Sequence, residues 1–140
     1  MQTRDQRLAF AIYERVLAFA TPNLSSKRRK QYGSMAHKLP ILIRTAGLSQ
    51  ALAFVEARHR EKEGKAPPQL KLLRDLEDVL RKEKMLEGAN LFAVARQAEI
   101  GEYMRLTHHT MAALLWFKRY AQSVLGVQQG EDADEEAEDA

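Results

Sequence analysis

The sequence predicts an all-α fold, a single-domain helical bundle of five to seven helices. Apolar residues recur three and four positions apart through most of the 140 residues, which is the spacing of a helix with one buried face. No strand-like alternation of apolar and polar residues continues for more than four positions. The length suits one domain with its own core, which we expect to occupy residues 1–130.

The first helix is predicted to begin after Thr3 and to end before the Thr21-Pro22 pair. Thr3, with Gln6 three positions later, has the pattern of a capping box. The apolar residues that follow at helical spacing define its core face: Leu8, Ile12, Val16, Phe19 and Ala20.

The second helix is expected to start at a cap formed by Ser25 or Ser26 and to continue to Gly47. Pro40 lies inside it. Because proline removes one backbone donor and crowds the carbonyl four residues earlier, we expect a kink or a new helix start there. The inward positions are predicted to be Tyr32, Met35, Leu39, Leu42, Ile43 and Ala46.

A third helix can be capped by Ser49, with Leu52, Phe54 and Val55 facing inward. A charged run follows, and Gly64 and Pro67-Pro68 mark its end as a loop.

The fourth helix is predicted from apolar residues at helical spacing, with its charged residues on the opposite, solvated side: Leu70, Leu73, Leu76, Val79 and Leu80. Asn90 can cap a short helix, Leu91–Glu99, and Gly101 is expected to separate it from the last one, about Glu102–Leu125. This last helix is apolar on most sides, and Leu115 and Trp116 fall outside its main face. A helix of this kind is either central to a bundle or also covered by a partner, and we expect at least one of these two side chains to be covered by a neighbouring subunit.

Composition argues against several kinds of protein. Cysteine is absent, the first residues are charged, and no apolar run approaches the roughly 20 residues that span a bilayer. These features suggest a cytoplasmic protein without a membrane segment.

The sequence also offers no catalytic residue, metal ligand set or cofactor motif. The four histidines lack the spacing of a zinc site, and there is no phosphate-binding loop or nucleophile elbow. Asp75 and Asp78 could share a helix face, as nuclease carboxylates do, but four bases surround them. We interpret them as members of a solvated, salt-bridged face and do not expect an enzyme.

The distribution of charge is uneven. Residues 1–130 hold all 22 lysines and arginines but only 12 of the 19 acids, and the last ten residues carry the other seven acids and no base. We expect residues 131–140 to form a disordered acidic tail, because like charges without large apolar residues cannot bury enough surface to fold. The basic body indicates a polyanion, an anionic membrane surface or an acidic protein partner.

The basic charge has a defined location. No Asp or Glu occurs in the 41 residues between Glu14 and Glu56. On a helical wheel, Lys27, Lys30, Ser34, His37 and Lys38 gather opposite the core face of the second helix, and Arg44 joins them if the kink at Pro40 is mild. We predict that this side of the second helix is a basic stripe that contacts nucleic-acid phosphates, and Arg29 lies beside it. The next candidates are Arg4, Arg7 and Arg15 on the first helix.

The stretch "YGSMAHKLPILIRTAGLSQALAFVEA" closely resembles the signature of the small-subunit family of the Cmr complex, the type III-B CRISPR effector. The resemblance rests on a Tyr-Gly pair, a His-Lys-Leu-Pro segment, Ile-Arg-Thr, Gly-Leu and Ala-Leu-Ala-Phe, over residues 32–54. "YMRLTHHTMAALLWFKRYA" is similar to the C-terminal helix of the family, and helix order and size agree over about residues 3–125.

This resemblance implies a small all-α protein without an active site. In the family, several copies stack into a filament along the backbone subunits, beside the guide RNA paired to its target RNA, in antiviral defence. The implied partners are the other Cmr subunits, including the large subunit and further copies of the chain, with guide RNA and target RNA contacted through basic faces. The tail, residues 131–140, has no place in the family pattern.

Two alternatives remain open from the residues alone. A basic helical adaptor could bind an acidic protein partner. A DNA-binding helix-turn-helix protein is the other, because "RTAGLSQALAFVEARH" imitates a turn followed by a recognition helix. However, Ser49 and Gln50 are the only polar residues between Gly47 and Glu56, which leaves few side chains to read base edges.

Overall fold

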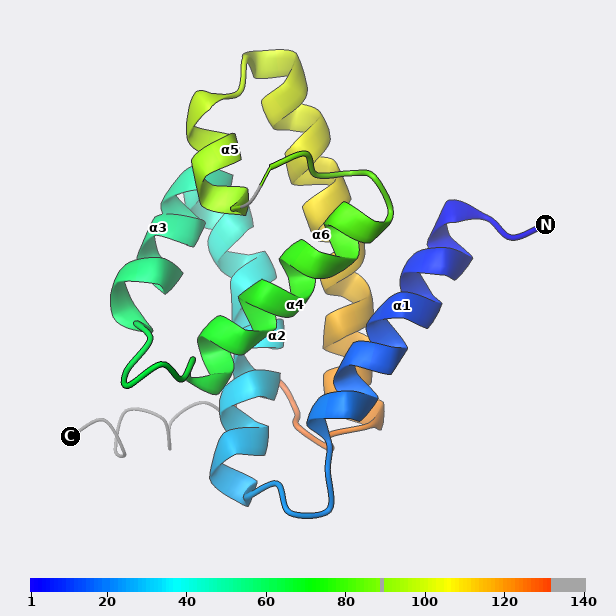
Figure 1. Ribbon diagram of the computed structural model, residues 1–140, viewed down its shortest axis with the longest axis vertical. Coiled ribbons are helices and arrows are strands. Elements are labelled where there is room, and N and C mark those ends of the chain that lie inside the picture. The colour runs from blue at the N-terminus through cyan, green and yellow to red at the C-terminus, as the bar shows by residue number, and fades with distance from the viewer. Residues whose placement is uncertain (89, 132–140) are drawn as a thin grey trace.

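The computed structural model describes residues 1–88 and 90–131, and six helices are found in these residues (Figure 1). In chain order they are α1 (Arg4–Phe19), α2 (Ser26–Ala46), α3 (Leu48–Arg58), α4 (Pro68–Lys82), α5 (Leu91–Gln97) and α6 (Ile100–Ser123). The prediction of an all-α, single-domain bundle of five to seven helices is confirmed.

α2 is the central helix of the bundle. It packs against α3, α4 and α6, while α1 lies beside α6 and also contacts α4 (Figure 1). Tyr32, Met35 and Leu39 on α2 are fully buried, as are Leu8 and Ile12 on α1 and Phe117 on α6. The core therefore lies between α2 and the helices around it.

Three predicted helix starts are confirmed by their side-chain caps. Thr3 and Gln6 form the capping box of α1, with hydrogen bonds of 2.8 and 3.0 Å. The Ser25 hydroxyl accepts from the amide of Arg28, 3.1 Å away, at the start of α2. The Asn90 side chain accepts from the amide of Ala93 at the start of α5.

Several predicted details of the helices are wrong. No new helix starts at Pro40, because α2 continues through this buried residue. Gly101 does not separate two helices, because α6 already begins at Ile100, directly after Glu99. Ala46 and Phe54, both predicted to face inward, are exposed.

The connection between α2 and α3 is a single residue, Gly47, with a φ of 89°. A helix-turn-helix motif has a turn of about three to four residues. α3 also turns Leu48, Ala51, Leu52 and Val55 into the core. The geometry of a DNA-reading helix pair is therefore not formed here.

The chain after α6 returns to α2 and completes the fold (Figure 1). We call residues 124–131 the C-terminal segment. Leu125 and Val127 of this segment are buried in the core. A Cβ atom at Gly33 of α2 would lie only 2.6 Å from the Val127 side chain, so glycine lets the segment approach the helix closely.

Candidate nucleic-acid interface

The N-terminal half of α2 carries the densest group of bases. Lys27 and Arg28 are exposed, and Arg29 and Lys30 are half-buried. These four bases precede residues 31–37, the stretch of α2 in which every residue is buried, so they lie at the more exposed start of the helix. This part of the predicted stripe is at the surface.

The middle of the predicted stripe is not exposed, which corrects the helical-wheel interpretation. Ser34 and His37 retain only 4% and 3% of their accessible surface. The Ser34 hydroxyl donates to the carbonyl of Glu131 at 3.1 Å, and the His37 Nε2 atom lies 2.9 Å from the carbonyl oxygen of Val127. The C-terminal segment therefore covers the centre of this face.

The remaining stripe residues lie beyond the covered part. Lys38 is half-buried and lines a small hollow with Ile41, Gln129 and Gly130. Arg44 is exposed near the end of α2. The stripe is thus two basic regions on one helix, separated by the C-terminal segment.

A second group of bases comes from the loop between α3 and α4, which the sequence analysis treated only as a charged connection. Glu63 and Gly64 both have positive φ, 54° and 75°, which is the conformation of a tight type I′ turn. On either side of it, Lys62 and Lys65 exchange two backbone hydrogen bonds of 2.9 Å. The turn therefore holds these two lysines opposite each other.

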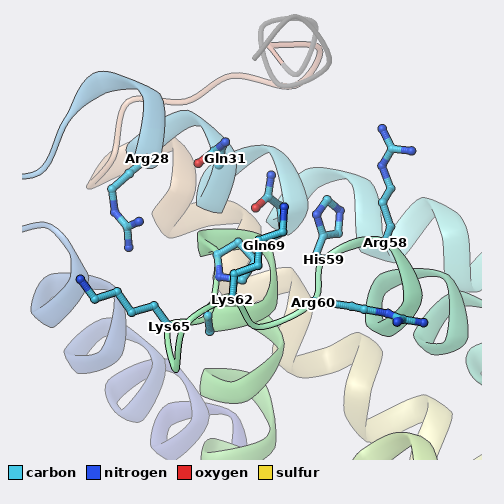
Figure 2. A pocket seen from close by; sticks show the side chains of 10 residues that line it. Arg28, Gln31, Arg58, His59, Arg60, Lys62, Lys65 and Gln69 are labelled. Carbon is cyan, nitrogen blue, oxygen red and sulfur yellow. The ribbon is translucent and has the colours of Figure 1, made fainter. Parts of the chain in front are cut away.

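This loop and the start of α2 enclose a basic pocket of about 620 Å³ (Figure 2). Figure 2 shows Arg28 and Gln31 on α2 facing Lys62, Lys65 and Gln69 across it. Among the residues that the structure describes, its lining includes five lysines and arginines and no acid: Arg28, Arg58, Arg60, Lys62 and Lys65, with His59, Gln31, Gln69, Ala66 and Pro67. Local sequence could have suggested these bases, but the nearby Glu61 and Glu63 obscured the signal.

The arginines of α1 have a different setting. Arg7 Nε lies 2.9 Å from a Glu83 carboxylate oxygen, and Arg15 lies 3.1 Å from Asp78. Arg4 is exposed at the start of the helix. Arg7 and Arg15 thus join α1 to α4 and its following turn, which leaves less of their charge for an outside ligand.

The carboxylates of α4 correct a second prediction, since two of them are buried rather than solvated. Asp75, 1% exposed, accepts a hydrogen bond from the Tyr32 hydroxyl at 2.7 Å and from Lys71 at 2.6 Å. Arg15 lies 3.6 Å away. Burial, reinforced by the charge of Asp75, raises the pKa of Tyr32 well above its usual value, so its phenol remains a donor.

Glu77 is the other buried carboxylate, again 1% exposed. It accepts from Arg74 at 2.9 Å and from the amide of Leu91 at 2.8 Å, and this second bond ties α4 to the start of α5. Arg74 also donates twice to Glu56 of α3. Burial acts to lower the pKa of Arg74, but its bonds to Glu56 and Glu77 outweigh this and raise it. These acids hold helices together.

The two predicted interface residues of α6 have different surroundings. Leu115 is 49% exposed. Trp116 is half-buried, since its indole N–H donates to Asp5 of α1 at 2.9 Å and its ring stacks on Tyr120. Other large apolar side chains that the sequence analysis did not select are also exposed: Phe10, Tyr13 and Leu17 at helical spacing on α1, and Ile100 and Met104 on α6.

Over residues 1–88 and 90–131, no three His, Asp or Glu side chains come together as metal ligands would. In the same residues, no helix combines the length and apolarity needed to cross a membrane.

Over residues 1–88 and 90–131, six helices with α2 at the centre, and bases concentrated on that helix and the adjoining loop, define a small all-α protein with a strongly basic face. The family model of the CRISPR-associated protein (Cas_Cmr5) matches residues 4–124. The chain therefore belongs to the Cmr5 family of CRISPR-associated proteins, which confirms the resemblance to the small-subunit family of the Cmr complex.

Two relatives from Thermus thermophilus agree with this assignment. The CRISPR system Cmr subunit Cmr5 is 44% identical over 125 residues, which is 89% of this chain and 98% of that protein. The crystal structure of a CRISPR-associated Cmr5 family protein superposes with a TM-score of 0.68 at 43% identity, covering 88% of this chain and 97% of the other.

Proposed function

We propose that this chain is the non-catalytic small subunit of a type III-B Cmr effector and that its basic surface contacts the phosphates of guide-paired target RNA. The observation that carries this proposal is the basic pocket with the adjoining turn of α2. Two segments distant in sequence bring their lysines and arginines together there, and none of the described residues that line the pocket is an acid. Acids elsewhere are distributed among bases, as on α4.

Phosphate contact is the recognition that such a surface can provide. Lysines and arginines bind the sugar–phosphate backbone through charge and hydrogen bonds that carry no sequence information. A subunit that must accept any target paired with the guide needs this kind of contact, because base pairing supplies the specificity. The proposed surface comprises Lys27, Arg28, Lys30 and Lys38 on α2, with Arg44, and the bases of the pocket.

We further propose that several copies stack along the backbone subunits of the complex. One isolated copy offers few phosphate contacts and binds weakly, whereas linked copies bind one RNA with a raised effective concentration. The exposed apolar side chains of α1 and α6 are candidates for the contacts between subunits.

The proposed lack of catalysis is supported by where the carboxylates lie. Asp75 and Glu77 are buried in hydrogen bonds and ion pairs that join helices, and Glu56 is bound by Arg74. None of these groups has the accessible, paired arrangement that a metal-dependent nuclease requires.

A binding experiment with labelled RNA tests this function. The assembled complex and the isolated subunit are each incubated with RNA in magnesium at salt concentrations from about 50 to about 200 mM. We expect the isolated subunit to bind weakly, with affinity falling steeply as salt rises, and to leave the RNA intact. The opposite outcome has two parts: the isolated subunit binds no RNA even at the lowest salt, and RNA binding by the complex does not depend on the basic surface of this subunit. That outcome would instead favour an acidic protein partner.

Leu115 tests the proposed contact between subunits. Leu115→Glu places a charge on a half-exposed position of α6, so we expect the isolated protein to keep its helical circular dichroism and to lose less than about 0.5 kcal/mol of stability. In reconstitution with the other Cmr subunits, the variant should be incorporated roughly ten-fold less well or worse, because a buried unpaired carboxylate disrupts an interface.

The matched control is Gln50→Glu, which adds the same charge at an exposed position on α3. It should be incorporated normally. If Leu115→Glu unfolds the isolated protein, or if it assembles as well as Gln50→Glu does, the residue is not at an interface.

A further inference from the structure

The basic pocket has a candidate occupant within the chain itself. Residues 131–140 carry seven carboxylates and no base, whereas the pocket lining, within residues 1–88 and 90–131, carries five lysines and arginines and no acid. The family match ends at residue 124, so this acidic segment is a feature of the chain beyond the region shared with the family.

The described part of the chain ends close to the pocket. Val127 is anchored against Gly33, and the Glu131 carbonyl accepts from Ser34 on α2. Arg28 at the pocket lies six residues before Ser34 on the same helix, which is about 9 Å along its axis at 1.5 Å per residue. The nine residues that follow Glu131 can span up to roughly 30 Å. The acidic residues are therefore tethered within reach of the pocket.

We propose that the acidic C-terminal end of this chain, residues 131–140, binds the basic pocket and competes there with RNA phosphates. Residues 132–140 lie outside the described part of the chain, and the inference rests on where Glu131 is anchored, on the length that follows it and on complementary charge. A tether this short gives the carboxylates an effective concentration in the millimolar range. A single weak phosphate contact is displaced at that concentration, whereas the many contacts of an assembled complex are not. The tail thus limits RNA binding by unassembled copies.

Two tail variants test the inference, which rests on the proposed function for its RNA readout. One is truncated after Glu131, and the other keeps the full length with the six later acids changed to Asn or Gln. We expect both isolated proteins to bind RNA roughly five- to ten-fold more tightly than the full chain at about 50 mM salt. The difference should vanish towards about 0.5 M salt, where charges are screened within a few ångströms.

A second arm does not depend on RNA. A peptide with the sequence of residues 131–140 is titrated into the truncated protein while the imidazole NMR signals are followed. His59 lines the pocket, so its signal should shift saturably, and the shift should disappear in the Arg60→Gln, Lys62→Gln, Lys65→Gln variant. The Asn/Gln form of the peptide is the control and should cause no shift.

The outcomes separate this inference from the proposed function. If the full chain and both variants bind RNA with the same measurable affinity, or if the acidic peptide leaves His59 unshifted, the inference is wrong. If the peptide binds the pocket but no form of the protein binds RNA, the tail contact stands and the proposed function fails.

Discussion

Asp75→Ala should destabilise this protein by about 3 kcal/mol, because it removes the shared partner of a buried charged network. Asp75 is 1% exposed and receives hydrogen bonds from Tyr32 on α2 and Lys71 on α4, with Arg15 of α1 beside it. Removing one partner from such a network typically costs about 3–5 kcal/mol of folding stability, because the remaining charged groups no longer have an opposite charge beside them. Arg15 and Lys71 are partly exposed, so water can solvate their charges after the substitution. We therefore expect a loss of stability at the lower end of this range.

The matched control for this prediction is Asp78→Ala, the same change nearly one turn further along the same helix. Asp78 is bound by Arg15 and Arg81 but its side chain is 38% exposed, so its loss should cost less than about 1 kcal/mol. Urea unfolding followed by circular dichroism measures both. Equal and small losses for the two variants would show that Asp75 does not hold α1, α2 and α4 together.

The Tyr32 contact also predicts how stability depends on pH. The folded state raises the pKa of Tyr32 and so favours its protonated phenol, which is the form that donates to Asp75. The stabilisation of the folded state by the Tyr32 phenol is fully present below the unfolded-state pKa of about 10. It is lost only as the pH rises above that value. Urea unfolding repeated across this alkaline range should therefore show stability falling less steeply in Tyr32→Phe than in the wild type.

The second large effect is expected at the basic surface. Changing Lys27, Lys30 and Lys38 together to Gln should weaken RNA binding by the assembled complex roughly a hundred-fold at about 100 mM salt, if each lysine contributes one phosphate contact. All three lie on α2, and Lys27 and Lys38 are about 16.5 Å apart along the helix axis at 1.5 Å per residue. The three lysines therefore belong to both basic regions of α2, on either side of the C-terminal segment, and the variant tests the two regions together. The loss should be equal for RNA targets of unrelated sequence, because backbone contacts do not read bases.

The control variant removes the same number of positive charges from other parts of the surface. Lys82, Lys84 and Arg119 are exposed and lie on α4, the turn after it and α6. Changing them together to Gln should leave RNA affinity within about three-fold of the wild type, because only long-range charge is lost. Fluorescence anisotropy with two unrelated targets measures both variants, after size-exclusion chromatography has shown that each enters the complex normally. If the two variants lose affinity equally, only net charge matters and the α2 surface has no special part.

The helices of this protein could be predicted because their signals are local. Thr3, Ser25 and Asn90 cap helices through hydrogen bonds to residues three positions away, and a cap of this kind is visible in a short window. The periodicity that buries Leu8 and Met35 is equally local.

The site was predicted only in part, because much of its shape depends on contacts between distant residues. A helical wheel describes one helix alone, and it could not show that Glu131, 97 positions away, covers Ser34. Asp75 likewise has the sequence pattern of a solvated acid, and only the folded structure shows that Tyr32, 43 positions earlier, packs on it. The pocket needs α2 and the α3–α4 loop side by side, which only the tertiary fold provides.

The salt dependence of target RNA binding tests the central claim, contact between the α2 surface and RNA phosphates, most directly. The logarithm of the association constant is measured against the logarithm of salt concentration for complexes that contain the wild type, the α2 triple variant or the control triple variant. We predict that the α2 variant flattens the slope by roughly two to three, which is about 0.7–0.9 for each lost phosphate contact, while the control retains the wild-type slope. A slope unchanged by the α2 substitutions in a correctly assembled complex would contradict the claim and place the RNA contacts on another surface.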